Sequence, residues 1–487
     1  MKRKILSALV ALLTINILGA VELVPTQQLL ASYLEQDSDL KNLALELKKA
    51  KLNQESTQID KGFTIKLSTG DMTMTFGDNN SFSVKPGVNA TIPEFNNLGV
   101  NVSSQVSVAD GKTSFDSASA TVSVDIISAN KANRDISLLK SERSVLEAER
   151  NLTAKATDKE KSFYKSLSSL LSSISNIVQK QNSIIDNYNS LEKIKLQGYA
   201  STSSTYIKAQ MKLESSERDL ESSIHTLIRD YKLFYLNCGY EIDIPEDTDF
   251  RELIPNDIPE VEAEDVTSYP AENYTQIESN LWNQTINQMS RDASTKLTLT
   301  ANGGYSYRNT NNGGSNTVSA GVSGSYEGIS LSASVNVPIA SNNKNSSGAA
   351  GGMGGSNTSS SPSVTLGLSY TPTTSKKNKI SDQLTEISVE QEQMKIDSAW
   401  SSYETAVREK QLKLEDINWD KETNQKNYEM YSAVEEQMLD YYKKGLISEK
   451  DYTSATINTL QAKVKGLINR IDLIVYNDEV KAMFVEK

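Results

Sequence analysis

The strict alternation of residues 328–340, GISLSASVNVPIA, is the feature that most limits how this chain can fold. Apolar side chains occupy every odd position from Ile329 to Ile339, and serine or asparagine occupies most positions between them. Since successive side chains of a strand point to opposite faces, this segment has one apolar and one polar face. The pattern leaves open whether a protein core, as in a soluble sandwich, or lipid covers the apolar face.

Similar alternating runs fill two stretches of the chain, residues 63–128 and 296–372. The second holds four runs, and its connectors are RNTNNGGSN, the tight pair EG, and a long Gly-, Ser- and Asn-rich segment that we expect to be an external loop. The first holds four comparable runs. Runs of about ten alternating residues match the strands of transmembrane barrels. Tyrosines near run ends are typical of membrane interfaces, and here they are Tyr305, Tyr307, Tyr326 and Tyr370. We therefore favour lipid over a second sheet.

Long helical segments follow each block of strands. In the first, apolar residues recur every seven positions, with a partner position four residues on, which indicates a coiled-coil seam over four heptads. The seam consists of Phe163, Leu170, Ile177, Ile184 and Leu191, with Leu167, Ile174 and Tyr188 at the partner position. A helix of about 70 residues is roughly 100 Å long, more than a compact domain requires, so we expect the helices to project.

The same order of elements occurs twice, which predicts an internal two-fold repeat. The expected segments are a helix at 21–62, strands at 63–128, long helices at 129–240, an acidic linker at 241–270, a helix at 271–295, strands at 296–372 and long helices at 373–487. Each long helical region contains a glycine, Gly198 or Gly445, followed by a polar turn and a returning helix. We expect the acidic linker to run along the surface.

The first 20 residues have the layout of a secretory signal peptide, with three cations, an apolar run and a final Gly-Ala pair. No later segment is apolar enough for a membrane helix, so we expect any membrane crossing to use strands. The net charge of −12, without a basic block, argues against nucleic acid as a partner.

The sequence gives little support to catalysis. It has no phosphate loop, no H-E-x-x-H and no nucleophile elbow. We expect His225, the only histidine, to be a solvated or packed helix residue. The single cysteine, Cys238, excludes an intrachain disulfide and a multi-cysteine metal cluster, and we expect it to be buried as a small hydrophobic residue. We therefore predict no enzyme, no cofactor and no metal site.

The duplicated pattern of helix, strands, long helix, turn and helix resembles the TolC-type outer-membrane efflux channels, the outer membrane factors. The nearest local likeness is YYKKGLISEKDYTSATINTLQAK, in which Tyr442, Gly445 and Ala455 match the family's helix turn. The resemblance implies an α+β outer-membrane protein, a homotrimer with one shared transmembrane β-barrel and a helical coiled-coil tunnel extending into the periplasm. It implies an exit duct for efflux or type I secretion, with a periplasmic adaptor and an inner-membrane pump of RND or ABC type as partners.

The resemblance also implies site residues. Asp451 matches a pore aspartate of the family's periplasmic gate and Tyr442 a linking tyrosine, while the turns at Gly198, Gly445 and Ser448 are candidate adaptor contacts. Other gate positions differ, because Ser454 and Ile447 replace an aspartate and an arginine. For Asp451, a helix N-terminal acid is an equal alternative, and for Tyr442, ordinary coiled-coil packing.

Two further questions stay open at this stage. The family uses two strands per repeat, twelve in a trimer, whereas this sequence shows up to four, so we expect twelve core strands with extra hairpins, or else a barrel of up to 24 strands. The alternative functions are a surface-exposed or periplasmic coiled-coil structural or adhesion protein, and a periplasmic efflux adaptor. The doubling argues against the first, and the lack of a lipoyl-like domain argues against the second.

Overall fold

The computed structural model describes residues 23–485 except 61, 63, 69–71, 76–80, 110–111, 246–247, 295–296, 311–312 and 342–360. The signal-like segment 1–20 and most of the Gly/Ser/Asn-rich loop lie outside the described residues. The chain is α+β and divides into two units. Unit 1 comprises Met1–Glu46, Glu149–Glu278 and Ala399–Lys487, and unit 2 comprises Leu47–Ala148 and Ser279–Ser398.

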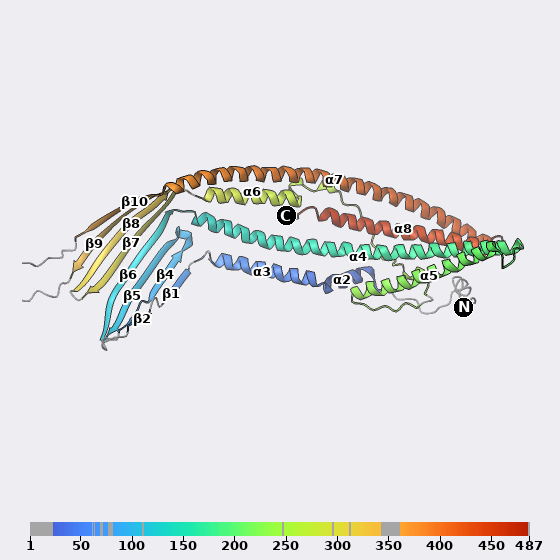
Figure 1. Ribbon diagram of the computed structural model, residues 1–487, viewed down its shortest axis with the longest axis horizontal. Helices are drawn as coiled ribbons and strands as arrows, with labels where there is room; N and C mark the ends of the chain where they lie inside the picture. The colour runs from blue at the N-terminus through green and yellow to red at the C-terminus, as the bar shows by residue number, and fades with distance from the viewer. Residues whose placement is uncertain are drawn as a thin grey trace, which may run out of the picture. The chain divides into compact units, whose positions relative to one another are not determined.

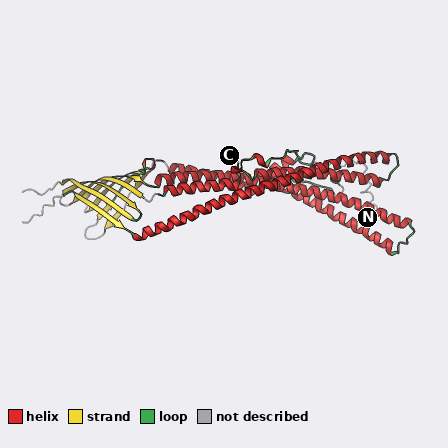
Figure 2. Ribbon diagram, turned by 90° about the horizontal axis from the view of Figure 1, so that it is seen from above, coloured by secondary structure: helices red, strands yellow, loops and turns green. Residues whose placement is uncertain are grey.

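Long helices dominate the chain (Figures 1 and 2). They are α2 (Thr26–Gln36), α3 (Ser38–Asp60), α4 (Asn130–Leu196), α5 (Ser204–Asn237), α6 (Thr275–Ala293), α7 (Pro372–Lys443) and α8 (Glu449–Lys481), with short 3-10 turns η1 (Pro93–Phe95), η2 (Phe250–Leu253), η3 (Val266–Ser268) and η4 (Ala271–Asn273). The first predicted helix is two helices, because Asp37 has extended backbone between α2 and α3. In the described part of the chain, no helix combines the length and the apolar character needed to span a bilayer.

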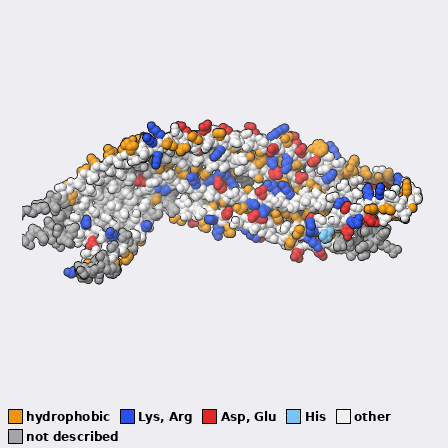
Figure 3. Space-filling view, viewed as in Figure 1, with side chains coloured by type: hydrophobic (Ala, Val, Ile, Leu, Met, Phe, Trp, Pro, Cys, Tyr) orange, Lys and Arg blue, Asp and Glu red, His pale blue; other side chains and the backbone are white. Residues whose placement is uncertain are grey.

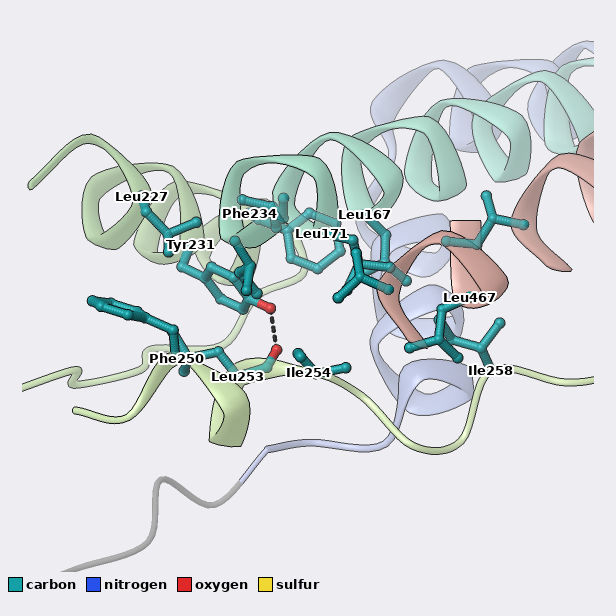
Figure 4. Packing of buried hydrophobic residues seen from close by; sticks show 14 of the residues in the cluster. Leu167, Leu171, Leu227, Tyr231, Phe234, Phe250, Leu253, Ile254, Ile258 and Leu467 are labelled. Carbon is teal, nitrogen blue, oxygen red and sulfur yellow. Dashed lines mark hydrogen bonds between the residues drawn. The ribbon is translucent and has the colours of Figure 1, made fainter. Parts of the chain in front are cut away.

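The core of unit 1 confirms most of the predicted heptad seam on α4. Phe163, Ile174 and Ile177 are fully buried, and the other apolar seam residues are nearly so. Tyr188 departs from the prediction, because its side chain is 42% exposed. Cys238 is fully buried, as expected. Figure 4 shows residues of α4, α5, α8 and the segment after α5 meeting in this core.

The segment 241–270 is not the surface linker that its acidic composition predicts. Its apolar side chains are buried in unit 1, and they are Ile244, Phe250, Leu253, Ile254, Ile258 and Val266. The Tyr231 hydroxyl of α5 donates a hydrogen bond to the Leu253 carbonyl, drawn in Figure 4. The described acids of this segment lie between the apolar positions and are exposed or half-buried, which masks the apolar pattern in the composition.

In unit 2, helices α4, α6 and α7 are joined by side-chain contacts. Ile136 of α4 packs against Ile286 of α6. The Arg143 guanidinium lies 5.1 Å from the Trp282 ring centroid, a cation–π geometry. Arg291 of α6 forms an ion pair with Glu392 of α7 at 3.0 Å. Apart from the second part of α3 and the turn η1, the remaining elements of unit 2 form one sheet.

The sheet is antiparallel throughout, and its strands pair in the order β1-β4-β5-β6-β7-β8-β9-β10, with β2 and β3 beside β5. The strands are β1 (Thr64–Ser68), β2 (Met72–Thr75), β3 (Ser81–Val84), β4 (Gly87–Ile92), β5 (Leu98–Ala109), β6 (Lys112–Ile127), β7 (Leu297–Thr310), β8 (Gly313–Tyr326), β9 (Ile329–Ser341) and β10 (Ser363–Tyr370). Strands from both halves of the chain therefore form one surface, joined where β6 pairs with β7.

The four short strands β1 to β4 of the first half combine into two long strands, each with an interruption: β1 with β2, and β3 with β4. β3 and β4 both pair with β5 and are separated only by Lys85 and Pro86, and β1 and β2 pair with β4 and β3 respectively. Each half thus contributes four long strands, as the sequence pattern indicates. The expected core of twelve strands with peripheral hairpins does not describe this protomer, because all eight long strands belong to one hydrogen-bonded order.

The connector between β7 and β8 is shorter than predicted. Glycine and asparagine suggested a loop over residues 308–316, yet ladder pairing continues to the pair Thr310 and Gly313. The EG connector is confirmed as a tight turn, since Glu327 and Gly328 both have positive φ, 46° and 90°.

Candidate functional site: a two-faced sheet and two helical turns

The apolar positions of all eight long strands share one face of the sheet. One row of directly paired residues crosses the whole sheet and contains only apolar residues and one glycine. This row is Ile65, Ala90, Val100, Val122, Gly303, Ala320, Val335 and Val364. Because faces alternate with period two, the apolar surface is continuous across both halves of the chain.

The opposite face is polar with equal consistency. The neighbouring row is Lys66, Asn89, Asn101, Thr121, Gly304, Ser319, Asn336 and Ser363. Apart from the lysine, its members carry short uncharged side chains or none. In the visible face of Figure 3, charged side chains are spread over the helices and are sparse over the sheet.

The apolar face is exposed within this chain. Leu67 is 75% exposed, Leu331 59% and Leu366 74%, and these residues come from three different strands. A contiguous apolar surface of this kind is rare on soluble monomers and marks contact with a membrane or another protein. A face that packed on a second sheet of the chain would have buried these side chains.

Aromatic residues mark two levels on the apolar face. Tyr326 pairs with Leu297 at the start of β7, and Tyr305 and Tyr307 lie eight and ten residues further along that strand. At about 3.4 Å per residue these separations are roughly 27 and 34 Å along the strand. With the tilt of about 40° found in barrels they correspond to roughly 21–26 Å of height, close to the apolar band of about 25 Å in outer-membrane barrels.

Two helical turns in unit 1 have the same construction. Gly198 ends α4 with φ 77° and Gly445 ends α7 with φ 68°. In both turns the glycine N–H donates to the carbonyl three residues earlier, and the N–H of the following residue donates to the carbonyl five residues before itself. These are the two hydrogen bonds of a Schellman motif. A Cβ on either glycine would meet nothing within 4 Å, so backbone conformation alone requires glycine there.

A serine begins each returning helix. Ser203 Oγ accepts from the Tyr206 N–H at 3.2 Å, and Ser448 Oγ accepts from the Asp451 N–H at 3.3 Å. Asp451 completes a capping box, because its Oδ2 accepts from Ser448 Oγ at 2.6 Å and from the Ser448 N–H at 3.2 Å. The hydrogen bond from Ser448 holds the pKa of Asp451 below its usual value. Asp451 therefore has the contacts of a helix N-terminal acid.

The tyrosine predicted at the second turn is paired within the same hairpin. Tyr442 of α7 stacks on Tyr452 of α8 with ring centroids 5.5 Å apart and an interplanar angle of 10°. Lys450 of α8 forms an ion pair with Asp186 of α4 at 2.9 Å, which joins the two hairpins. Sequence reasoning missed Tyr452, Lys450 and Asp186, since nothing in the spacing of one helix indicates its partner on another.

Both turns also expose large apolar side chains. Leu196 is 88% exposed at the end of α4, and Leu446 is 69% exposed after α7. The structure thus gathers the candidate residues Gly445, Ser448, Asp451 and Tyr442 at one turn, while Gly198 forms the equivalent turn of the first half. Among the described residues, no group of three or more His, Cys, Asp or Glu side chains is placed to hold a metal ion. His225 lies exposed on α5.

Comparison with known proteins gives two family matches and a set of similar structures. Residues 29–258 match the model of the TP096X N-terminal domain, and residues 259–487 match that of the TP096X C-terminal domain. The boundary between the two falls in the segment between α5 and α6. A search of curated proteins finds no significant match.

Solved structures that are similar to the chain include channels of the outer membrane. A membrane protein from Pseudomonas aeruginosa is 12% identical, with 95% of this chain and 91% of that chain covered and a TM-score of 0.47. The outer-membrane channel OprN is 13% identical, with 93% and 89% covered and a TM-score of 0.46. The outer-membrane protein VceC from Vibrio cholerae is 11% identical, with 95% and 97% covered and a TM-score of 0.45.

Proposed function

We propose that this chain is a TolC-type outer-membrane channel, which works as a homotrimer and is not an enzyme. The observation that carries the proposal is the sheet with one continuous, exposed apolar face and one face of short polar side chains. Lipid covers the apolar face and water fills the side of the polar face, which is how strands of an outer-membrane barrel are built. The two halves of the chain are structural repeats that contribute equally to the barrel.

The helical parts extend into the periplasm and form a coiled-coil tunnel. The protein is the exit duct of a tripartite efflux or type I secretion system, which passes small molecules or proteins from an inner-membrane pump to the exterior. A periplasmic adaptor contacts the turns at Gly198, Gly445 and Ser448, supported by the exposed Leu196 and Leu446 beside them. The first 20 residues direct export.

The periplasmic gate lies at the second turn. Tyr442 is stacked on Tyr452 and Asp451 is fixed by Ser448, so both candidate gate residues are held in defined positions. The ion pair between Lys450 and Asp186 links the hairpins that separate when the gate opens. An acidic ring at Asp451 favours passage of cations over anions.

Fractionation and reconstitution test this function. The protein, produced with an export signal in a bacterium with two membranes, should sediment with the outer membrane and resist extraction by alkaline carbonate. The purified protein should release a small dye from lipid vesicles. Recovery as a soluble periplasmic protein that leaves vesicles intact would contradict the proposal and support the coiled-coil structural or adaptor alternatives.

A further inference from the structure

The sheet ends at two edges whose strands have one partner each. β1 pairs only with β4, and β10 pairs only with β9, in the part of the chain that the structure describes. Each edge therefore presents backbone N–H and C=O groups that can bind another strand. The β10 sequence, SVTLGLSY, contains no lysine and no proline, the residues that usually protect an edge from such pairing.

A helix with an exposed apolar stripe adjoins each edge strand in the chain. α3 ends at Asp60, four residues before β1, and α7 begins at Pro372, two residues after β10. On α7 the stripe consists of Ile380, Leu384, Ile387 and Met394, all more than half exposed and spaced by four, three and seven residues. Such spacing places them on one face of the helix.

The stripe on α3 has the matching character. Leu52 and Ile59 are seven residues apart and are 56% and 68% exposed. Charges of both signs flank the two stripes, since exposed Lys48, Lys49 and Glu55 lie on α3 and exposed Lys377, Glu386 and Glu390 lie on α7. Two exposed apolar seams with heptad-like spacing and charged flanks have the features of a coiled-coil contact between different chains.

We infer that the β10–α7 edge of one copy binds the β1–α3 edge of the next, so that three copies close one barrel of 24 strands. The inference rests on the proposed function, because the number of three copies is taken from the homotrimer proposed there. Each copy brings eight long strands in one hydrogen-bonded order. β10 runs toward the helices and β1 runs away from them, so the new contact is antiparallel like every other pair in the sheet. The apolar face then continues across it from Leu366 and Leu368 to Leu67.

The strand number sets the width of the duct. Twenty-four strands about 4.8 Å apart and tilted by about 40° give a barrel roughly 48 Å across between backbones, against roughly 24 Å for twelve. The inner rows carry mostly serine, threonine, asparagine and glycine, which project only a few ångströms. The wider barrel has room for a folded domain of about 100 residues, which is roughly 34 Å across. A barrel of twelve strands admits only unfolded chain or small molecules.

Electron microscopy of the purified mature protein in lipid nanodiscs tests the width directly. We expect three-fold particles whose barrel measures roughly 48 Å between backbones. Three-fold particles with a barrel of roughly 24 Å would overturn the inference and leave the proposed channel intact. Particles that carry no membrane-embedded barrel would contradict the channel itself, so the two failures are distinguishable.

Cysteine cross-linking tests the edge contact. In a Cys238→Ser background, Ile65→Cys or Leu67→Cys is combined with Val364→Cys, Leu366→Cys or Leu368→Cys, since directly opposite residues in antiparallel strands lie within disulfide range. At least one of the six pairs should give covalent trimers on oxidation, because β1 and β10 of one chain lie at opposite edges.

The matched control combines Leu67→Cys with Val322→Cys. Val322 faces the same side but lies on β8, which has partners on both edges, so this pair should remain monomeric in denaturing gels. Monomers from all six edge pairs, with trimeric particles still formed, would overturn the edge contact.

Discussion

Asp478 and Glu479 are neighbours on α8 but their carboxyl groups have opposite surroundings. Glu479 accepts hydrogen bonds from Lys410 and Lys413 of α7 at 2.5 and 2.7 Å. Asp478 has a buried Oδ2 without a hydrogen-bond partner. Burial, together with the nearby Glu160, raises the pKa of Asp478 to about 7, whereas the two lysines lower the pKa of Glu479 to about 2 against the opposing effect of burial.

The raised pKa of Asp478 predicts a loss of stability as pH increases. Between about pH 4 and 7 the unfolded state ionises while the folded state keeps its proton, so stability falls across this window. Asp478→Asn removes the effect and should raise the free energy of unfolding at pH 8 by roughly 2–4 kcal/mol, with little change at pH 4. Melting temperatures of the full mature protein in detergent between pH 4 and 8 measure it. The exposed Glu221→Gln serves as a control, and equal effects of both variants at pH 8 would refute the account.

Glu479 should act in the opposite direction. Its pKa is lowered on folding, so its contribution is present above the unfolded value of about 4.5 and is lost as pH falls toward 2. Glu479→Gln leaves two lysines without their acceptor and should destabilise the protein at pH 7 by about 1–3 kcal/mol. The control is Lys444→Met, which removes the exposed pair with Asp440 and should cost less than about 0.5 kcal/mol. If the control cost as much as the Glu479 variant, the pairing would not explain the stability.

Adjacent residues of β9 should respond differently to charge. Val335 lies on the apolar face and Ser334 on the polar face. Val335→Arg should cost about 2–4 kcal/mol of stability in lipid and reduce the yield of membrane-inserted protein. Ser334→Arg, one position away, should insert normally. The amount of protein that co-sediments with lipid vesicles after refolding measures both. Equal insertion of the two variants would show that lipid does not contact this face.

The two helical turns should tolerate alanine poorly for a purely conformational reason. Gly198→Ala and Gly445→Ala force a side chain into the left-handed region at a cost of about 1–2 kcal/mol each, although neither meets a neighbouring atom. Gly466→Ala, inside α8, also meets nothing but sits in helical conformation, so it should raise stability by up to about 1 kcal/mol. Thermal unfolding of the three variants checks the opposite signs. A drop in melting temperature for Gly466→Ala equal to the others would point to crowding instead.

The fold was predictable where local periodicity determines it. Alternation located the strands, and heptad spacing found the buried seam of α4 from Phe163 to Leu191. The prediction for Tyr188 failed although Ile184 and Leu191 on either side of it are buried with Leu213 of α5, so which seam positions α5 covers does not follow from the spacing along α4 alone. The segment 241–270 failed because its composition is acidic while its apolar residues are spaced irregularly, without the period of either helix or strand.

The candidate site was predictable only in part. The glycine and serine of each turn have local signatures, and the structure gives both the expected turn geometry. The contacts between helices could not be predicted in this way, because the Tyr442–Tyr452 stack and the Lys450–Asp186 ion pair depend on how separate helices align. The roles of Asp451 and Tyr442 in gating remain proposals that conductance must test.

Single-channel conductance of the mature protein in planar lipid bilayers tests the central claim most directly. The proposed function predicts long-lived discrete openings of uniform size, which rise sharply in conductance when Asp451→Asn or Tyr442→Ala loosens the periplasmic turn. A protein that never inserts and migrates as a soluble oligomer would contradict it, because the apolar face of β9 would then be covered by protein and not by lipid.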